Sequence, residues 1–495
     1  MPPFRSRLRR ATVFLVSIAV VAAAPIAGTQ PAAAAPDAGL VRKLNRVLSD
    51  NRVEKAGTGA VVLDARSGEV LYNRGGSKAL MPASNTKIVT AAAALETLKP
   101  SYRFETRVIR RAKVVDGVLQ GRLYLKGYGD PTLRRADLER LAKAVKASGI
   151  TKVSGSLFVD PTFFESRQYN PGWSTSYADD YYAAPISALT LAPNADYDSG
   201  TVLINYKPGR TGHKAKITTT PAAARKYIKI SNKTTTSSSG TSTTFSASRN
   251  HGSNTITVRG RVPRGRSGSR LITVHRPELY AAAVFRAELT RQKITVTGST
   301  KVGATPSAGR ELVARDRSMR LDDLLIPFMK LSNNMHAEAL TKAMSRKTGG
   351  SGTWRDGLAV TTAYMKKIGT PMSGISLTDG SGLTRRNRLT ARGLATFLQL
   401  IPSEDWYGAF YASMPVAGNS KRMVGGTLRY RMNGTRAANN ARGKTGTLTG
   451  VTALSGYVTG RDGSRYTYSM ISNYSGSTPR PVENSFVIAL ANWNG

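Results

Sequence analysis

One stretch near the start of the chain restricts its fold more than any other, the alanine-rich segment at residues 88–95. It reads Ile-Val-Thr-Ala-Ala-Ala-Ala-Leu, so it favours a helix and is apolar on nearly every side. Such a helix has to be buried, and Pro100 is expected to end it. The fold must therefore surround this segment with other elements.

Strand patterns precede this helix and recur at the end of the chain. Residues 59–64 and 69–73 are short apolar runs around a Ser-Gly turn, a pattern typical of a β-hairpin. Residues 449–458 and 466–471 form a second such pair around the turn Arg461-Asp462-Gly463. Helical patterns lie between, at residues 321–326, 335–344 and 358–368.

The middle of the chain has a different texture. It contains short alternating strands, and the Ser/Thr-rich segment at residues 234–248 is expected to be a flexible, solvated loop. A chain of 495 residues is also too long for one simple core. We expect an α/β fold, an α+β sandwich, made from residues 36–100 and 300–495 and interrupted by a large, mostly β insertion at residues 101–299.

The N-terminus has the features of an export signal. Four arginines between residues 5 and 10 precede an apolar run from residue 11 to about residue 24, and small residues follow at positions 33–35. The run is shorter than the ~20 residues of a membrane span. We expect residues 1–35 to be a signal peptide and the protein to be extracellular or associated with the cell wall; an uncleaved signal would instead anchor it to the membrane.

Composition excludes several classes of site. The chain has no cysteine, which rules out disulfides, thiol catalysis and cysteine-ligated zinc. Its formal net charge is +42, from 72 basic and 30 acidic residues. The basic residues are dispersed and accompany no nucleic-acid-binding motif, so we expect no nucleic acid partner. The charge suits either the anionic polymers of a bacterial wall or a generally basic, soluble surface.

The first candidate catalytic element is Ser84-Asn85-Thr86-Lys87 at the start of the buried helix. Residues three apart lie on the same helix face, so the Ser84 hydroxyl and the Lys87 amine are neighbours. Desolvation lowers the pKa of a lysine and favours a free amine that can take a proton from serine. The alternative is an ordinary surface lysine whose amine reaches the solvent.

The second element is Ser332-Asn333-Asn334, before a predicted helix. Ser332 and Asn334 can both face a cleft, one passing protons and the other binding a substrate amide. The same residue types are also ordinary helix caps, and Ser-x-Asn occurs twice more, at Ser49 and Ser248.

The third element is Lys444-Thr445-Gly446, which leads into the late strands. A cation and a hydroxyl on an edge strand can hold a carboxylate, and a glycine lets a substrate backbone come close. A second Lys-Thr-Gly at Lys347 opens a Gly-Ser loop, with no strand after it, and is rejected as a helix terminus. A phosphate-loop interpretation also fails, because Ala438 stands where a glycine is required.

Taken together and in this order, the three motifs resemble those of β-lactamases and penicillin-binding proteins. The context in residues 81–87, Met-Pro-Ala-Ser-Asn-Thr-Lys, and in residues 379–383, Asp-Gly-Ser-Gly-Leu, resembles class C low-molecular-mass penicillin-binding proteins. These are D-alanyl-D-alanine carboxypeptidases and endopeptidases with a penicillin-binding/β-lactamase-like transpeptidase domain, and an insertion after the first motif is typical of them. The likeness covers nearly all of the mature chain.

The resemblance implies a role for each motif residue. Ser84 would attack the bond between two D-alanines of a peptidoglycan stem peptide, with Lys87 as its general base. Ser332 would relay a proton to the leaving amine, and Asn334 would bind the acyl side of the substrate. β-Lactam antibiotics would acylate the same serine.

The resemblance also implies a carboxylate site and an oxyanion hole. Lys444 and Thr445 would hold the terminal carboxylate, and the backbone N–H groups of Ser84 and Thr447 would form the oxyanion hole. Arg385 or Arg386, in a loop that is either near the site or a structural turn, would help to bind the peptide side chain. The insertion segment that would bind the end of that side chain departs from the family spacing; its residues are Trp173, Ser176, Asp179, Asp180, Tyr181 and Tyr182.

Other functions fit the sequence less well. A β-lactamase shares the motifs, but the chain has no Glu-x-x-Leu-Asn segment to position a hydrolytic water. A Ser-His-Asp hydrolase is disfavoured because there are only four histidines and no Gly-x-Ser-x-Gly elbow. A non-catalytic cationic wall-binding factor remains the alternative from another class. We expect no cofactor and no metal.

Overall fold

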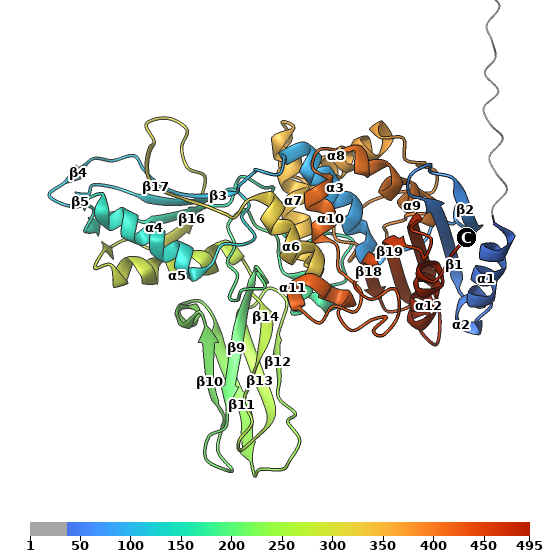
Figure 1. Cartoon of the computed structure of the whole chain (residues 1–495). Helices are drawn as coiled ribbons and strands as arrows, with labels where there is room; N and C mark the ends of the chain where they lie inside the picture. The colour runs from blue at the N-terminus through green and yellow to red at the C-terminus, as the bar shows by residue number, and fades with distance from the viewer. Residues whose placement is uncertain (1–36) are drawn as a thin grey trace, which may run out of the picture. The chain divides into compact units, whose positions relative to one another are not determined.

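The two ends of the described chain meet in one central sheet (Figure 1). The protein's structure is a computed structural model, and it describes residues 37–495. From edge to edge the sheet contains β18 (Arg442–Leu448), β19 (Val451–Thr459), β20 (Arg465–Asn473), β1 (Gly57–Asp64) and β2 (Val70–Arg74). All neighbouring strands are antiparallel, and the predicted hairpins β1–β2 and β19–β20 are confirmed.

Helices cover both faces of this sheet. Successive strand residues point to opposite faces, so Ala453 and Ile471 join one apolar cluster while Leu454 and Met470 join another. The helices of this part are α1 (Ala38–Leu48), α2 (Asn51–Glu54), α3 (Thr86–Leu98), α6 (Leu321–Leu331), α7 (Asn334–Lys347), α8 (Trp354–Lys367), α9 (Ala391–Leu400), α10 (Tyr407–Ser413), α11 (Arg422–Gly425) and α12 (Arg480–Ala491). The architecture is the sandwich expected from the sequence.

Helix α3 is the buried helix that the alanine-rich segment predicts. Every residue from Thr86 to Leu95 is buried. Helices α7 and α8 pack against it in the larger apolar cluster. It ends at Leu98, and Lys99 then adopts a left-handed conformation with φ 75° before Pro100. The prediction of a helix enclosed on all sides and stopped at Pro100 is confirmed.

The middle of the chain builds four further sheets with an apolar cluster of their own. Two sheets contain β3 (Glu105–Arg110), β4 (Val114–Val115), β5 (Val118–Leu119), β6 (Leu123–Gly127), β7 (Lys152–Val153), β8 (Leu157–Asp160), β15 (Thr295–Val296), β16 (Thr300–Val302) and β17 (Glu311–Arg317). The other two contain β9 (Thr201–Lys207), β10 (Lys216–Thr220), β11 (Lys229–Ser237), β12 (Ser246–Arg249), β13 (Thr255–Pro263) and β14 (Gly268–Thr273). Two helices, α4 (Arg135–Ala147) and α5 (Pro277–Arg291), were not anticipated.

The expected Ser/Thr-rich loop is largely wrong. Strands β11 and β12 take up its two ends, so that residues 238–245 alone lie outside strands. Strand β11 pairs in parallel with β13, and its side chains alternate, with Thr234 and Thr236 buried and Thr235 exposed. Threonine is β-branched and suits a strand with one buried face, and this preference outweighs the polar composition.

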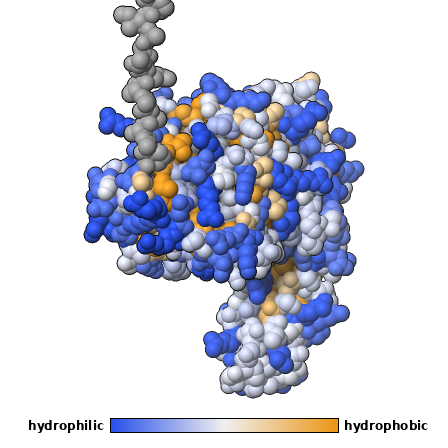
Figure 2. Space-filling view, turned by 90° about the vertical axis from the view of Figure 1, so that its right-hand side faces the viewer, coloured by the Kyte–Doolittle hydropathy of each residue, from blue (hydrophilic) through white to orange (hydrophobic). Residues whose placement is uncertain are grey.

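The described residues, 37–495, belong to one compact unit, and the domain boundaries near residues 100 and 300 stay a prediction. The predicted signal peptide, residues 1–35, lies outside the described residues. Among residues 37–495, no helix combines the length and apolar character that crossing a bilayer requires. Hydrophilic residues cover most of the face in Figure 2, with small apolar patches between them. Short 3-10 helices complete the fold: η1 (Ala83–Asn85), η2 (Thr175–Tyr177), η3 (Tyr181–Ala183), η4 (Ala222–Lys226), η5 (Ile401–Ser403) and η6 (Gly426–Leu428).

The packing of α3 predicts that replacing a buried alanine by leucine destabilises the protein more than the same change at an exposed alanine. Ala93→Leu adds volume to a residue with 0% exposure and is expected to lower the free energy of unfolding by about 1–3 kcal/mol. Ala363→Leu, at an exposed position of α8, is the matched control and should change it by less than about 0.5 kcal/mol. Urea denaturation of the two variants measures both values, and equal losses would contradict the enclosed packing.

Candidate active site

Ser84 lies in the short turn η1, directly before α3 begins at Thr86. The Lys87 amine, one turn later, donates a hydrogen bond to Ser84 Oγ at 2.8 Å. The preceding residue, Ala83, has a φ of 45°, a conformation that residues with a side chain rarely adopt. The backbone is thus strained next to the hydroxyl, as is common at functional sites.

Lys87 is fully buried, and its amine has two further acceptors. It donates to Asn334 Oδ1 at 2.6 Å and to the carbonyl of Ser381 at 2.8 Å. Burial lowers the pKa of Lys87 to about 7, although the negative charges of Asp379 and Glu338 oppose the shift. The amine is therefore held in place and partly deprotonated near neutral pH, which a base for the Ser84 hydroxyl requires.

The segment Ser332-Asn333-Asn334 joins α6 to α7. Ser332 takes a left-handed conformation at the end of α6, with φ 60°. Asn333 caps α7, because its side chain accepts the backbone N–H groups of Met335 and His336. The cap leaves Asn334 as the first helical residue, and its side chain contacts both the Lys87 amine and, through Nδ2 at 2.8 Å, the carbonyl of Tyr182.

The edge strand β18 carries the third motif. The buried Lys444 amine donates to Ser332 Oγ at 2.8 Å and to the carbonyl of Thr445 at 2.9 Å. Burial, and next the charge of Lys87, lower the pKa of Lys444 well below its usual value. A Cβ on Gly446 would lie 2.5 Å from the Pro82 carbonyl, so only glycine lets β18 pack this closely against the Ser84 turn.

A cavity of about 280 Å³ opens over these groups. Its lining residues are Ser84, Tyr177, Tyr182, Asn334, Gly382, Leu383, Thr447, Leu448 and Thr449. Ser84, Asn334 and Thr447 thus share one cavity, and the Lys87 amine is hydrogen-bonded to the first two. Ser332 and Lys444 bond each other and are not among its lining residues. The first two motifs contribute Ser84 and Asn334 to its lining, and Thr447, directly after the third motif on β18, lies in the same lining.

Arg385 lies at the rim of this arrangement. Its guanidinium donates to the carbonyl of Thr449, which lines the cavity, and contacts the Met81 sulfur at 3.8 Å. For Arg386, the backbone N–H donates to Thr384 Oγ1 at 3.1 Å. Of the two arginines, Arg385 is the one that contacts a residue lining the cavity.

Two acids fix the loop at residues 379–383: Asp379 of the loop itself and Glu338, which the sequence analysis did not single out. Glu338, one helical turn after Asn334, accepts the backbone N–H groups of Gly380 at 3.0 Å and Ser381 at 2.9 Å. It also accepts Nε1 of Trp354 at 2.7 Å. Burial and the nearby charge of Asp379 raise the pKa of Glu338 to about 7. This network holds the Ser381 carbonyl against Lys87.

Asp379 ties the same loop to the insertion. Its carboxylate accepts Nε1 of Trp173 at 2.9 Å and the backbone N–H groups of Gly382 and Thr384, both at 2.7 Å. Trp173 therefore supports the loop beneath the cavity, whereas its neighbours Tyr177 and Tyr182 line the cavity itself.

The remaining insertion candidates make local contacts. Ser176 Oγ bonds Ser174 Oγ at 2.7 Å, and Asp180 accepts the Tyr182 hydroxyl at 2.6 Å. Asp179 accepts the backbone N–H of Arg249 at 3.4 Å. None of these three candidates is among the residues lining the catalytic cavity.

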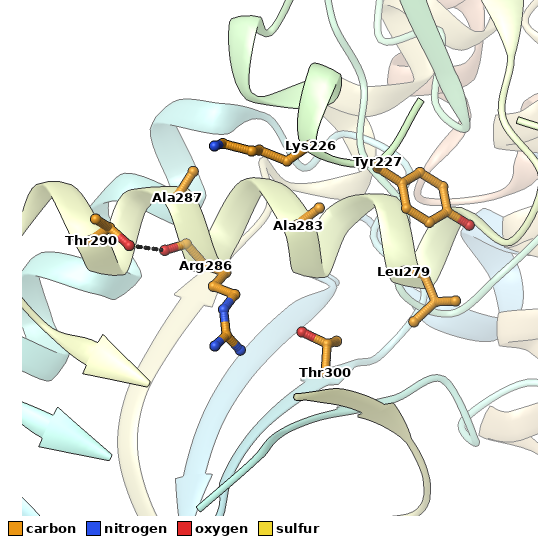
Figure 3. A pocket seen from close by; sticks show the side chains of 8 residues that line it. All are labelled: Lys226, Tyr227, Leu279, Ala283, Arg286, Ala287, Thr290 and Thr300. Atoms are coloured by element: carbon orange, nitrogen blue, oxygen red, sulfur yellow. Dashed lines mark hydrogen bonds between the residues drawn. The ribbon is translucent and has the colours of Figure 1, made fainter. Parts of the chain in front are cut away.

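A separate cavity of about 470 Å³ lies in the middle of the chain, along α5 (Figure 3). Arg286 and Thr300 lie on one side of the helix in this view, and Lys226 and Tyr227 lie on the other. No residue of the three motifs lines it. This cavity along α5 is therefore separate from the predicted site.

Comparison with known proteins decides the family. A model of the D-Ala-D-Ala carboxypeptidase 3 (S13) family matches residues 40–493. The chain belongs to this family. It is 38% identical over 462 residues to the D-alanyl-D-alanine carboxypeptidase of Actinomadura sp., a match that covers 91% of this chain and 84% of that protein. The resemblance inferred from the three motifs is confirmed.

A sequence match and a solved structure from Haemophilus influenzae agree. The present chain is 26% identical to the D-alanyl-D-alanine carboxypeptidase DacB of Haemophilus influenzae, over 86% of this chain and 88% of that protein. The crystal structure of penicillin binding protein 4 (dacB) from the same organism matches with a TM-score of 0.77 and 25% identity, over 91% of this chain and 99% of that one. The chain is thus a serine-type D-Ala-D-Ala carboxypeptidase with the penicillin-binding fold; the roles of its individual site residues stay predictions.

Glu338 offers a test of how the loop is held. Glu338→Ala leaves two backbone N–H groups and the Trp354 ring N–H without their acceptor, so we expect the free energy of unfolding to fall by at least about 2 kcal/mol. The control Glu311→Ala removes an acid that is paired with Arg110 at an exposed site and should cost less than about 1 kcal/mol. Denaturant unfolding compares them, and similar small losses would contradict the role given to Glu338.

Proposed function

We propose that this carboxypeptidase works through an acyl-enzyme on Ser84. The observation that carries the proposal is the Lys87 amine, 2.8 Å from Ser84 Oγ and with its pKa lowered to about 7. Lys87 takes the hydroxyl proton as Ser84 Oγ bonds to the carbonyl carbon between two D-alanines. The C–N bond then breaks, and water later hydrolyses the ester to release the shortened peptide.

The proton needed by the leaving amine comes through Ser332. Ser332 Oγ bonds the Lys444 amine at 2.8 Å, and Lys87 bonds Asn334, two residues further along the chain. This arrangement supports Ser332 as the relay and Asn334 as the group that binds the acyl side. Backbone N–H groups of Ser84 and Thr447 stabilise the oxyanion, and both residues line the catalytic cavity.

Lys444 and Thr445 hold the carboxylate of the residue that leaves. They are neighbours on β18, where the Thr445 hydroxyl lies 2.8 Å from the Thr427 hydroxyl. A carboxylate at this position favours the charged form of Lys444, which burial otherwise disfavours. Arg385, at the rim, contacts the peptide side chain of the substrate.

The substrate is the stem peptide of peptidoglycan, and β-lactams acylate Ser84 as substrate analogues. One solved relative, penicillin binding protein 4 of Haemophilus influenzae, is described in complex with a novel β-lactam, which supports this proposal. The protein is exported by the signal at residues 1–35 and works outside the cell at the wall. Its large excess of basic over acidic residues holds it near anionic wall polymers.

Covalent capture tests the nucleophile. After penicillin treatment, intact-mass analysis should show one adduct on the parent and none on Ser84→Ala, because that variant lacks the only proposed nucleophile. Ser413→Ala, which removes a buried hydroxyl bonded to the Phe410 carbonyl, is the control and should still form the adduct. An adduct on Ser84→Ala would refute the assignment, and rapid turnover of the parent adduct would indicate a β-lactamase.

The acylation rate should depend on pH through Lys87. The neutral amine is the base and the pKa of Lys87 is about 7, so the rate is expected to rise about tenfold from pH 6 to pH 8 and then level off. Stopped-flow acylation by a chromogenic cephalosporin measures this profile. A rate that falls as the pH rises through 7 would mean that the charged amine is the active form.

A further inference from the structure

A second cavity, of about 410 Å³, adjoins the catalytic cavity at Thr447, which lines both. Thr445 lines only this second cavity, whereas Ser84 and Asn334 line only the first. Neighbouring tyrosines on η3 divide in the same way, Tyr181 toward the second cavity and Tyr182 toward the first. The tip of β18 thus separates two hollows of one groove.

The second cavity is strongly basic. Five of its twelve lining residues are lysine or arginine and none is acidic; the five are Lys330, Arg422, Arg429, Arg431 and Arg480. Carboxylates from outside the lining occupy two of them, since Arg422 pairs with Asp196 and Arg431 pairs with Glu483. Within residues 37–495, the other three have no carboxylate partner. Of these three, Lys330 is buried and donates to the Met414 carbonyl, so the guanidinium groups of Arg429 and Arg480 are the positive charges left without a carboxylate partner.

Two of these unpaired cations are guanidinium groups near the groove. Arg480 Nη2 approaches Thr447 Oγ1 at 3.4 Å, which places it beside the shared wall. Arg429 lies 4.9 Å from the ring centre of Tyr430, whose side chain is 70% exposed. Guanidinium groups bind carboxylates in a two-pronged geometry, so this wall suits a carboxylate ligand.

The position of the cavity identifies which part of a substrate reaches it. In the proposed function, Asn334 binds the acyl side and Thr445 binds the carboxylate of the residue that leaves. The hollow beyond Thr445 is therefore on the leaving-group side. A D-alanine whose carboxylate is held by Thr445 is small beside this cavity of about 410 Å³, so a larger leaving group has room to extend toward Arg429 and Arg480.

We propose that this cavity is a subsite for a leaving group that carries a second carboxylate, recognised by Arg429 and Arg480. The inference rests on the proposed function and extends it: the same Ser84 step then releases the amine of an acidic residue or peptide. The C–N bond that breaks and the proton delivered to the amine are unchanged. The positive charges of Arg429 and Arg480 favour leaving groups with a second carboxylate over leaving groups without one.

A pair of isosteric peptides tests the subsite. Both carry the diacetyl-L-lysyl-D-alanyl acyl half; one releases D-glutamate and the other D-glutamine. The parent should hydrolyse the D-glutamate peptide with a kcat/KM about 3- to 10-fold higher, because only that leaving group has the second carboxylate. In Arg429→Gln and in Arg480→Gln the ratio should fall, and in the double variant it should approach one.

The control is Arg461→Gln, which removes an exposed arginine from the turn between β19 and β20, outside the lining of the cavity. It should keep the parental ratio. A parental ratio of one, or a ratio that survives in the double variant, overturns the subsite. An equal fall for both peptides also overturns it, because the arginines would then act through Thr447. Failure of the proposed function looks different: the parent would cleave neither peptide and would form no penicillin adduct on Ser84.

Discussion

The amine of Lys87 is the group on which the rest of the catalytic half depends. It is fully buried, and its hydrogen-bond acceptors are a hydroxyl, an amide oxygen and a backbone carbonyl, all of them neutral. A buried cation without a contacting carboxylate is unfavourable, so burial lowers the pKa of the Lys87 amine and favours its neutral form. The apolar helix around Lys87 is therefore part of the chemistry as well as of the core.

The two acids nearest to Lys87 do not contact its amine but bind the loop that does. Glu338 and Asp379 accept backbone N–H groups of residues 380–384, and this fixes the Ser381 carbonyl against the amine. Trp173 binds Asp379 and Tyr182 accepts from Asn334, so residues from the middle of the chain complete the shell around Lys87. The large segment between the first and second motifs is thus joined to the catalytic groups at two points, one on the loop and one on the helix.

The sequence predicted what depends on local spacing. The contact of Ser84 with Lys87 follows from positions three apart on a helix, and burial follows from the alanines. The role of Glu338 was not predicted, because a glutamate in a helix has no special meaning until its neighbours are known. Ser381 contributes a backbone carbonyl, and any residue type could supply that group, so the sequence does not indicate it. Helix α4, in contrast, could have been predicted, because its apolar residues have helical spacing: Leu138, Leu141, Ala142 and Val145. The alternating strand patterns on both sides of it led to the prediction of a mostly β segment.

The two site lysines cannot both be charged at low cost. They lie on facing elements, both buried, and the charge of Lys87 is a direct cause of the lowered pKa of Lys444. In the proposed function, a carboxylate that binds at Lys444 compensates that amine and favours its proton. The two opposite charges formed in this way nearly cancel at Lys87, so the lowered pKa of Lys87 is kept while the carboxylate is bound. Binding of a carboxylate at Lys444 and a free amine beside Ser84 are therefore compatible, although two charged lysines without the carboxylate are not.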